Sequence, residues 1–232
     1  MFNQFGQTGN AEVFELNGAA GPIARSGQLD ALVALEQLGV RRSYTRDAEI
    51  YAEGDRADCW FRVVSGTIRI CKLMADGRRH VADFFQTGDC FGLDGTGERS
   101  FSAEAVGDAV VMRFSRAATE RLIEERPALA RGICNMTLRN LAHAQTRMLL
   151  LGRMTAAERV ASFLRELAER RDVRRHLDVP MSRNDIADYL GLTIDTVCRV
   201  LSAFKRDGLI AIPSPHRIEL CDREALETFG DA

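Results

Sequence analysis

The stretch MSRNDIADYLGLTIDTVCRVLSAFKRDGL, residues 181–209, contains two short helical patterns joined by a glycine. Ser182, followed three residues later by Asp185, is a capping box and predicts a helix that begins at the next residue. Gly191 ends this helix, and Thr193 is a candidate N-cap for a second helix that stops before an Asp-Gly pair. Apolar residues recur at helical spacing in both segments. Two helices with about three residues between them, one a glycine, form a helix-turn-helix pattern.

The second helix of such a pattern places its N-terminal residues on the base edges of DNA. Ile194, Asp195, Cys198 and Arg199 lie off its apolar face. Arginine can donate two hydrogen bonds to guanine, and a carboxylate can accept one from cytosine, so Asp195 and Arg199, one turn apart, suit a G·C pair or two adjacent ones. The alternative is a pair of core helices with solvated surface charges, and charge does not decide, because four acids balance four bases in residues 181–212. The motif pattern favours DNA reading.

The run DIADYLGLTIDTVCR, residues 185–199, resembles the CRP/FNR superfamily of bacterial transcription regulators, and it looks most similar to the FixK-like branch. FNR-related members carry Glu-x-x-Ser-Arg on the recognition helix, where this chain has Asp195-x-x-Cys198-Arg199. The resemblance extends over roughly residues 30 to 230. It implies an activator that binds a TTGA-type inverted repeat as a homodimer and recruits RNA polymerase, with a link to nitrogen fixation. Ile194 stands where CRP-like relatives carry an arginine, and its side chain would meet a thymine methyl.

The chain has 232 residues, 46% of them hydrophobic, and a net charge of −2, which is ordinary for a two-domain cytoplasmic protein without general affinity for polyanions. No apolar run of 18 residues suggests a membrane span. We expect an α+β protein in four segments. They are an N-terminal extension (1–27), a β-roll (28–125), a dimerisation helix (126–152) and a winged helix-turn-helix DNA-binding domain (153–232).

Short strand patterns separated by turn residues between residues 40 and 114 predict an antiparallel barrel or jelly roll. Its glycines resemble those of the cyclic-nucleotide-binding β-roll. In that domain an Arg-Ser pair holds the cyclic phosphate, and Arg99-Ser100 matches it, but no glutamate follows Gly92 for the ribose. In that domain a Thr or Ser on the dimer helix contacts the adenine, and the resemblance places the corresponding position near Ala144 and Gln145. The resemblance therefore implies a roll that has lost its nucleotide and needs no cofactor; a cAMP-responsive regulator is the alternative.

A different class of function would be an enzyme or ligand-binding module built on the roll. The four histidines are scattered, there is no paired-carboxylate or nucleophile motif, and we predict neither a metal site nor catalysis. The six cysteines are spread singly, which disfavours disulfides in a cytosolic protein. None precedes Cys59, so the N-terminal iron-sulfur ligands of FNR are not expected.

A helix expected after Pro127 carries a 4-3-4-3 apolar seam typical of a two-stranded contact. The seam residues, predicted to form the homodimer interface, are Ala130, Cys134, Thr137, Leu141, Ala144, Met148 and Leu151. A second stripe of Leu129, Ile133 and Met136 would suit packing on the chain's own roll, and both contacts can coexist. A hinge is expected at residues 151–153.

After the recognition helix, two short apolar runs around Pro213-Ser214-Pro215-His216 predict a β-hairpin wing. Phosphate contacts would position the domain without reading sequence. The candidates for these backbone contacts are Ser182, Thr193, Thr196, Lys205, Arg206, His216 and Arg217. The alternative for the four basic residues of this set is that their charges are solvated on the surface and contact no phosphate. Cys198 is also a candidate redox switch, because its oxidation would put charge and bulk against DNA; it is otherwise a small residue in place of serine.

Overall fold

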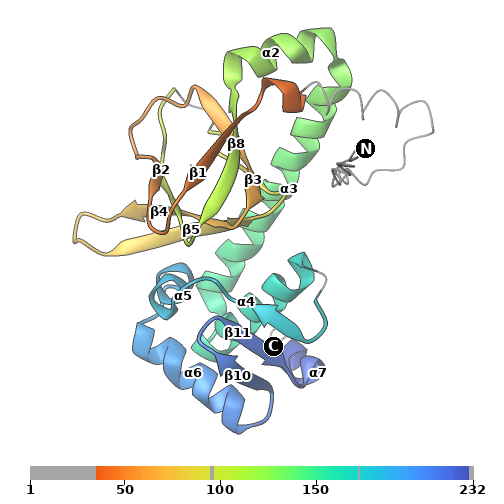
Figure 1. Cartoon of the computed structure of the whole chain (residues 1–232). Helices are drawn as coiled ribbons and strands as arrows, with labels where there is room; N and C mark the ends of the chain where they lie inside the picture. Colours follow the sequence, from red (N-terminus) through yellow and green to blue (C-terminus); the bar gives the residue numbers. More distant parts are fainter. Residues whose placement is uncertain (1–34, 95–96, 172, 230–232) are drawn as a thin grey trace, which may run out of the picture.

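The computed structural model describes residues 35–94, 97–171 and 173–229, which form two parts joined by one long helix (Figure 1). The N-terminal part is a β-roll, and the C-terminal part is a helical domain with a small sheet. The predicted α+β fold class is therefore confirmed. The predicted extension, residues 1–27, lies outside the described residues; residues 35–38, near the start of the roll, are helical.

The roll consists of two antiparallel sheets of order β1-β8-β3-β6 and β2-β7-β4-β5 within the described residues. The strands are β1 (Val40–Tyr44), β2 (Glu49–Tyr51), β3 (Cys59–Ser65), β4 (Thr67–Leu73), β5 (Arg79–Gln86), β6 (Cys90–Phe91), β7 (Ser102–Ala105) and β8 (Ala109–Ser115). Gly66 makes the β3–β4 turn at φ 89°, where a Cβ would lie 2.6 Å from the carbonyl oxygen of Asp108. Only glycine fits this turn.

Aromatic side chains fill the interior of the roll. The rings of Tyr51, Phe61 and Phe91 stack with centroids 5.1 to 6.2 Å apart, and Phe85 lies 5.6 Å from Phe91. Ile68 is fully buried beside them. Ring centroids at these distances are within the range that aromatic pairs prefer. The core of the roll is thus formed by protein side chains.

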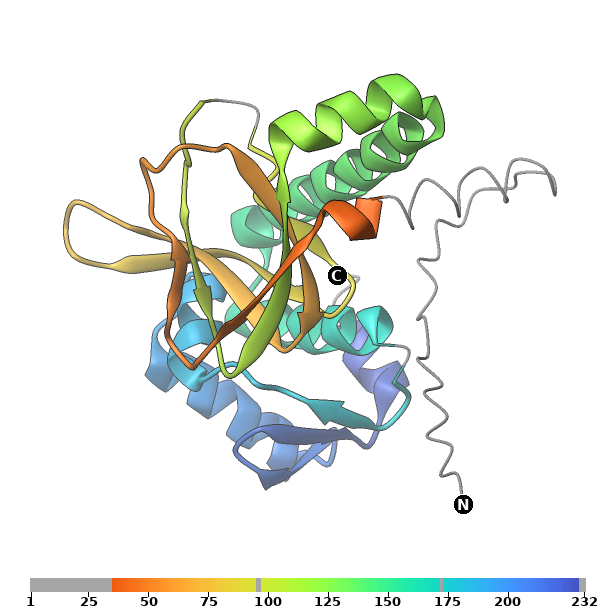
Figure 2. The ribbon, with the colours of Figure 1, turned by 45° about the horizontal axis from the view of Figure 1, so that its top comes forward.

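Two helices pack side by side at one end of the roll (Figure 2). They are α2 (Arg116–Glu125) and α3 (Pro127–Arg153), and α3 begins at the proline as predicted. Leu129 and Met136 of α3 are buried in one cluster with Trp60 of the roll. The second apolar stripe predicted for this helix therefore packs on the chain's own roll.

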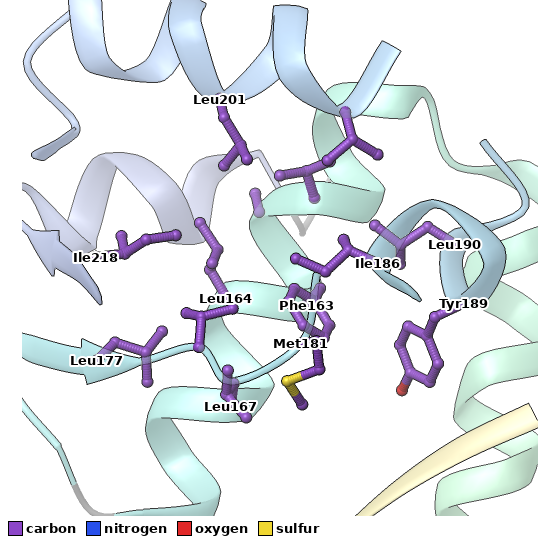
Figure 3. Packing of buried hydrophobic residues seen from close by; sticks show 14 of the residues in the cluster. Phe163, Leu164, Leu167, Leu177, Met181, Ile186, Tyr189, Leu190, Leu201 and Ile218 are labelled. Atoms are coloured by element: carbon purple, nitrogen blue, oxygen red, sulfur yellow. The ribbon is translucent and has the colours of Figure 1, made fainter. Parts of the chain in front are cut away.

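The C-terminal part has a helical core and a three-stranded sheet of order β10-β11-β9. Its elements are α4 (Ala156–Arg170), β9 (His176–Asp178), α5 (Arg183–Leu190), α6 (Ile194–Arg206), β10 (Ile210–Ser214), β11 (Arg217–Leu220) and α7 (Arg223–Thr228). Leu164, Ile186, Leu201 and Ile218 come from four of these elements and meet in its interior (Figure 3). The winged helix-turn-helix arrangement is present.

The structure departs from the sequence-based expectations in three places. The strands β6 and β9 have two and three residues, too few for an alternating pattern to reveal them. Strand β10 continues through Pro213 to Ser214 with a register shift after Ala211, where a turn is expected from the sequence. The hinge expected at residues 151–153 is helical, and the break between α3 and α4 falls at residues 154–155.

Candidate DNA-binding site

The first helix of the motif, α5, has both end signals that the sequence predicts. The Asp185 backbone N–H donates to Ser182 Oγ at 3.0 Å, and the Ser182 N–H donates to the Asp185 carboxylate at 3.0 Å. Gly191 ends the helix with φ 63° in the left-handed region. The second helix, α6, is capped by Thr193, whose Oγ1 accepts from the backbone of Thr196 at 3.2 Å. These caps fix where α6 begins.

One face of α6 is buried and the opposite face is open to solvent. Val197, Leu201 and Phe204 pack into the core of the domain. The four predicted base-reading residues lie on the open side and are all exposed: Ile194, Asp195, Cys198 and Arg199. Contacts made by a partner on this side would leave the buried face of the helix undisturbed.

The predicted backbone-contact residues are spread over three places. Ser182, Thr193 and Thr196 lie at the two helix starts and already make the caps described above. Lys205 and Arg206 are exposed at the far end of α6. On the wing, His216 Nδ1 lies 3.1 Å from the carbonyl oxygen of Val179, and the Arg217 guanidinium lies 3.3 Å from the Asp178 carboxylate. The wing residues therefore have partners within the domain.

Arg183, the first residue of α5, is a further candidate that the sequence analysis does not single out. Its side chain is half-buried, and its Nη1 has no hydrogen-bond partner among the described residues. Burial lowers the pKa of Arg183, and the neighbouring Cys198 opposes this shift. Arg183 lies at the start of α5, near Cys198 on the open side of α6. The sequence signal that could have identified Arg183 is a basic residue directly after an N-cap.

In the roll, Arg99 is engaged by the protein itself. Its side chain is 1% exposed, its Nη1 lies 2.7 Å from the Asp94 carboxylate, and the same atom donates to the Gly92 carbonyl at 2.8 Å. The guanidinium also donates to the Cys59 carbonyl and packs 4.2 Å from the centre of the Tyr51 ring. Its Nε has no hydrogen-bond partner among the described residues. The charge of Arg99 is thus already neutralised by Asp94.

Cys59, Cys71 and Cys90 are buried, while the thiols of Cys134, Cys198 and Cys221 are exposed. In the described ranges, no group of three or more His, Cys, Asp or Glu side chains is arranged to hold a metal ion. No helix among the described residues has the length and apolar character needed to cross a membrane.

Two family models match this chain, a cyclic nucleotide-binding domain over residues 41–126 and a Crp-like helix-turn-helix domain over residues 158–229. The nitrogen fixation regulation protein FixK of Azorhizobium caulinodans is 42% identical over 214 residues, which cover 90% of this chain and 84% of that protein. The chain belongs to the CRP/FNR family of transcription regulators.

Other CRP/FNR proteins agree with this assignment. FixK of Bradyrhizobium diazoefficiens is 42% identical over 190 residues, covering 79% of this chain and 80% of that protein. The solved structure of FixK2 from Bradyrhizobium japonicum superposes with a TM-score of 0.80 at 40% identity, covering 84% of this chain and 98% of the other. The resemblance to the FixK-like branch is confirmed. As a member of this family, the chain is a transcription regulator with a helix-turn-helix DNA-binding domain.

Proposed function

We propose that the chain acts as a homodimer that binds a TTGA-type inverted repeat through α6 and activates transcription by recruiting RNA polymerase. The observation that carries this proposal is the exposed pair of Asp195 and Arg199 near the start of α6. The mechanism is recognition of DNA without covalent chemistry. Because the FixK relatives are named as regulators of nitrogen fixation, genes of that process are the first candidates for its targets.

Base reading is assigned to four side chains of α6. Arg199 would donate two hydrogen bonds to a guanine, and Asp195 would accept from a cytosine amino group. Ile194 is 49% exposed and would contact a thymine methyl. Cys198 lies between Asp195 and Arg199 in the sequence and on the same open side, so we place its side chain beside the bases. Aspartate is one methylene shorter than glutamate, so the arginine contact is expected to dominate.

The dimer is proposed to form along α3. The predicted seam lies on the side of α3 that the roll leaves open, with Leu141 53% exposed and Met148 74% exposed. Cys134, Thr137 and Ala144 of the same seam are also exposed. Large apolar side chains at coiled-coil spacing are stabilised when a second copy covers them. A twofold dimer would also present α6 twice, as an inverted repeat requires.

Phosphate contacts are assigned to residues beside the reading face. Lys205 and Arg206 are exposed and basic, Arg183 has a donor without a partner among the described residues, and the three capping hydroxyls lie at helix starts. Helix N-termini favour anions, since their free N–H groups point outward. His216 and Arg217 would join this set if the wing releases its contacts with Asp178 and Val179. Such contacts set register on the duplex without reading bases.

We propose that binding needs no cyclic nucleotide. The supporting observation is the internal ion pair of Arg99 with Asp94 at 2.7 Å, since a cyclic phosphate would have to displace that carboxylate. In addition, Leu93 follows Gly92, at the position where the nucleotide-binding domain carries the glutamate that holds the ribose. A cAMP-responsive regulator of the same fold is the competing proposal.

Gel-shift titrations separate these proposals. The purified protein is titrated onto a TTGA palindrome and onto scrambled DNA of equal length, first without ligand and then with excess cAMP. We expect specific binding about 10³-fold or more tighter than to scrambled DNA, unchanged by cAMP. Equal affinity for both DNAs would reject the operator assignment. Specific binding that appears only with cAMP would favour the competing proposal.

A further inference from the structure

Helix α5 has a second face that is not part of the helix-turn-helix core. Ile186 and Leu190 point into the C-terminal core, whereas Asp185, Asp188 and Tyr189 lie at positions i, i+3 and i+4 and contact the roll. Figure 3 shows the Tyr189 ring directed away from Leu201 and toward the strand of the roll drawn in yellow. Figures 1 and 2 place α5 beside β5.

The charged part of this contact joins two arginines of the roll to two aspartates of α5. Arg79 on β5 lies 2.5 Å from the Asp185 carboxylate and 2.8 Å from the Asp188 carboxylate. Arg69 on β4 lies 3.2 Å from Asp185 and is held within the roll by Glu104 at 2.6 Å. The side chains of Arg69 and Asp185 are 7% and 5% exposed. These charges are therefore buried between the two parts of the molecule.

The aromatic part of the contact involves three further elements. Tyr189 lies 5.0 Å from the Phe84 ring of β5 and 5.6 Å from the Phe163 ring of α4. The Arg147 guanidinium of α3 stacks 3.8 Å from the centre of the Tyr189 ring. Residues of the roll, the long helix and the C-terminal core thus meet around one side chain of α5.

Buried ion pairs contribute little net stability, because removing both charges from water offsets their attraction. They do require one geometry, since any other arrangement leaves a buried charge unpaired. The Asp185 carboxylate is held from both sides of this contact. It accepts a hydrogen bond from the Ser182 backbone, which completes the cap of α5, and it accepts hydrogen bonds from Arg69 and Arg79 of the roll. A change in the angle between the roll and α5 would therefore break several hydrogen bonds at once.

We propose that Arg69 and Arg79 of the roll, paired with Asp185 and Asp188 of α5, form an interdomain latch that fixes the orientation of the recognition helix and so selects the spacing between operator half-sites. This inference rests on the proposed dimer. Helix α6 packs against α5 and moves with it, while α3 carries the seam, so the latch sets the geometry between the two copies of α6. Half-sites are spaced by one helical turn or multiples of it, so orientation errors cost affinity.

The test uses Arg79 and Asp188, because Arg69 also holds the roll and Asp185 also caps α5. Full-length Arg79→Ala, Asp188→Asn and the double variant are titrated onto palindromes whose half-site separation is varied by one and two base pairs. Arg79→Lys tests rescue by a retained charge. The matched control is Arg78→Ala, an adjacent arginine that is 82% exposed and pairs with Asp76. Circular dichroism checks that each variant is folded.

We expect each latch variant to lose about five- to tenfold in affinity at the preferred spacing and little at the others, a size typical of coupling between sites. The double variant should be no weaker than Arg79→Ala alone, because Asp188 contributes to the latch through Arg79. Arg78→Ala should match the wild type. An unchanged spacing preference in both single variants, or an equal loss on every DNA including scrambled DNA, would overturn the latch.

A second readout separates this inference from the proposed function. If the wild type itself shows no spacing preference, the operator proposal fails, and hydrogen exchange then decides on the latch. Faster exchange of the α5 and β5 amides in Arg79→Ala, with α6 unchanged, supports the interdomain latch. Unchanged exchange at α5 overturns it.

Discussion

On the open side of α6, Arg199 Nε lies 3.3 Å from the Asp195 carboxylate, one turn earlier on the helix, with the side chains 73% and 77% exposed. The hydroxyl of Thr196 lies 3.4 Å from the same guanidinium. An exposed pair of this kind contributes less than about 1 kcal/mol, so exchanging it for a base contact costs little. The Arg199 guanidinium is thus available for a contact on the open side of α6.

Arg199→Ala is expected to weaken binding by about 5- to 150-fold for each half-site of the palindrome, the equivalent of about 1–3 kcal/mol for each bidentate guanine contact. The loss should disappear when the contacted G·C pair is replaced, since the variant no longer reads it. Fluorescence anisotropy with operators substituted one pair at a time measures this.

Lys205→Ala is the matched control for Arg199→Ala, because it removes a positive charge from the same helix. It should weaken binding similarly on operator and scrambled DNA and reduce the salt slope by about one for each protomer of the dimer. A palindrome affinity unaffected by Arg199→Ala would contradict the assignment of base reading to α6.

Much of the motif can be predicted from the sequence because its signals are local. Ser182 and Asp185 are three residues apart, and each side chain accepts a hydrogen bond from the backbone N–H of the other. Such a pair makes these bonds wherever it begins a helix. The latch contacts cannot be predicted in this way. Arg79 and Asp188 are 109 residues apart, and nothing in either local pattern shows that the acids of α5 face the roll rather than solvent.

The dimer proposal predicts that Leu141→Glu produces monomers. A carboxylate at the middle of an apolar seam would be buried and unpaired in the dimer, which is strongly unfavourable. Analytical ultracentrifugation of the variant should show one species of single-chain mass that no longer binds the palindrome with high affinity.

Leu73→Glu is the control for the seam variant, because it makes the same chemical change away from α3. Leu73 is 69% exposed at the end of β4. It should remain dimeric. A Leu141→Glu protein that sediments as the wild-type dimer would place the interface elsewhere.

The redox hypothesis predicts that peroxide lowers the DNA affinity of the wild type but not of Cys198→Ser. The exposed thiol lies on the reading face, and its oxidation to a sulfinic acid adds bulk and negative charge next to the phosphates. Anisotropy before and after oxidation measures the change, and mass spectrometry locates it. Cys221→Ser is the control, because Cys221 is also exposed but lies outside α6, and it should stay sensitive. Equal losses in wild type and Cys198→Ser would exclude the switch.

The buried carboxylate of Asp185 predicts a dependence of stability on pH. Burial alone would raise the pKa of Asp185, but hydrogen bonds from Ser182 and the charges of Arg69 and Arg79 outweigh it and hold the pKa below its ordinary value of 3.8. A lowered pKa in the folded state means that the ionised form stabilises the fold. This contribution is complete above the ordinary pKa and is lost as the pH falls below it toward the folded-state pKa.

Asp185→Asn should therefore lower the free energy of unfolding by about 3 kcal/mol at pH 7, the usual cost of leaving buried arginines without their partner. The difference from the wild type should shrink steadily below about pH 4, because the Asp185 carboxyl takes up a proton there in the unfolded wild type and only at still lower pH in the folded wild type. Urea titrations at pH 7, 5, 4 and 3 measure both curves. Asp58→Asn, which changes an exposed carboxylate 3.6 Å from Arg113, should shift stability by less than about 1 kcal/mol. A deficit for Asp185→Asn that stays constant from pH 7 to pH 3 would show that the charge of Asp185 does not stabilise the contact between α5 and the roll.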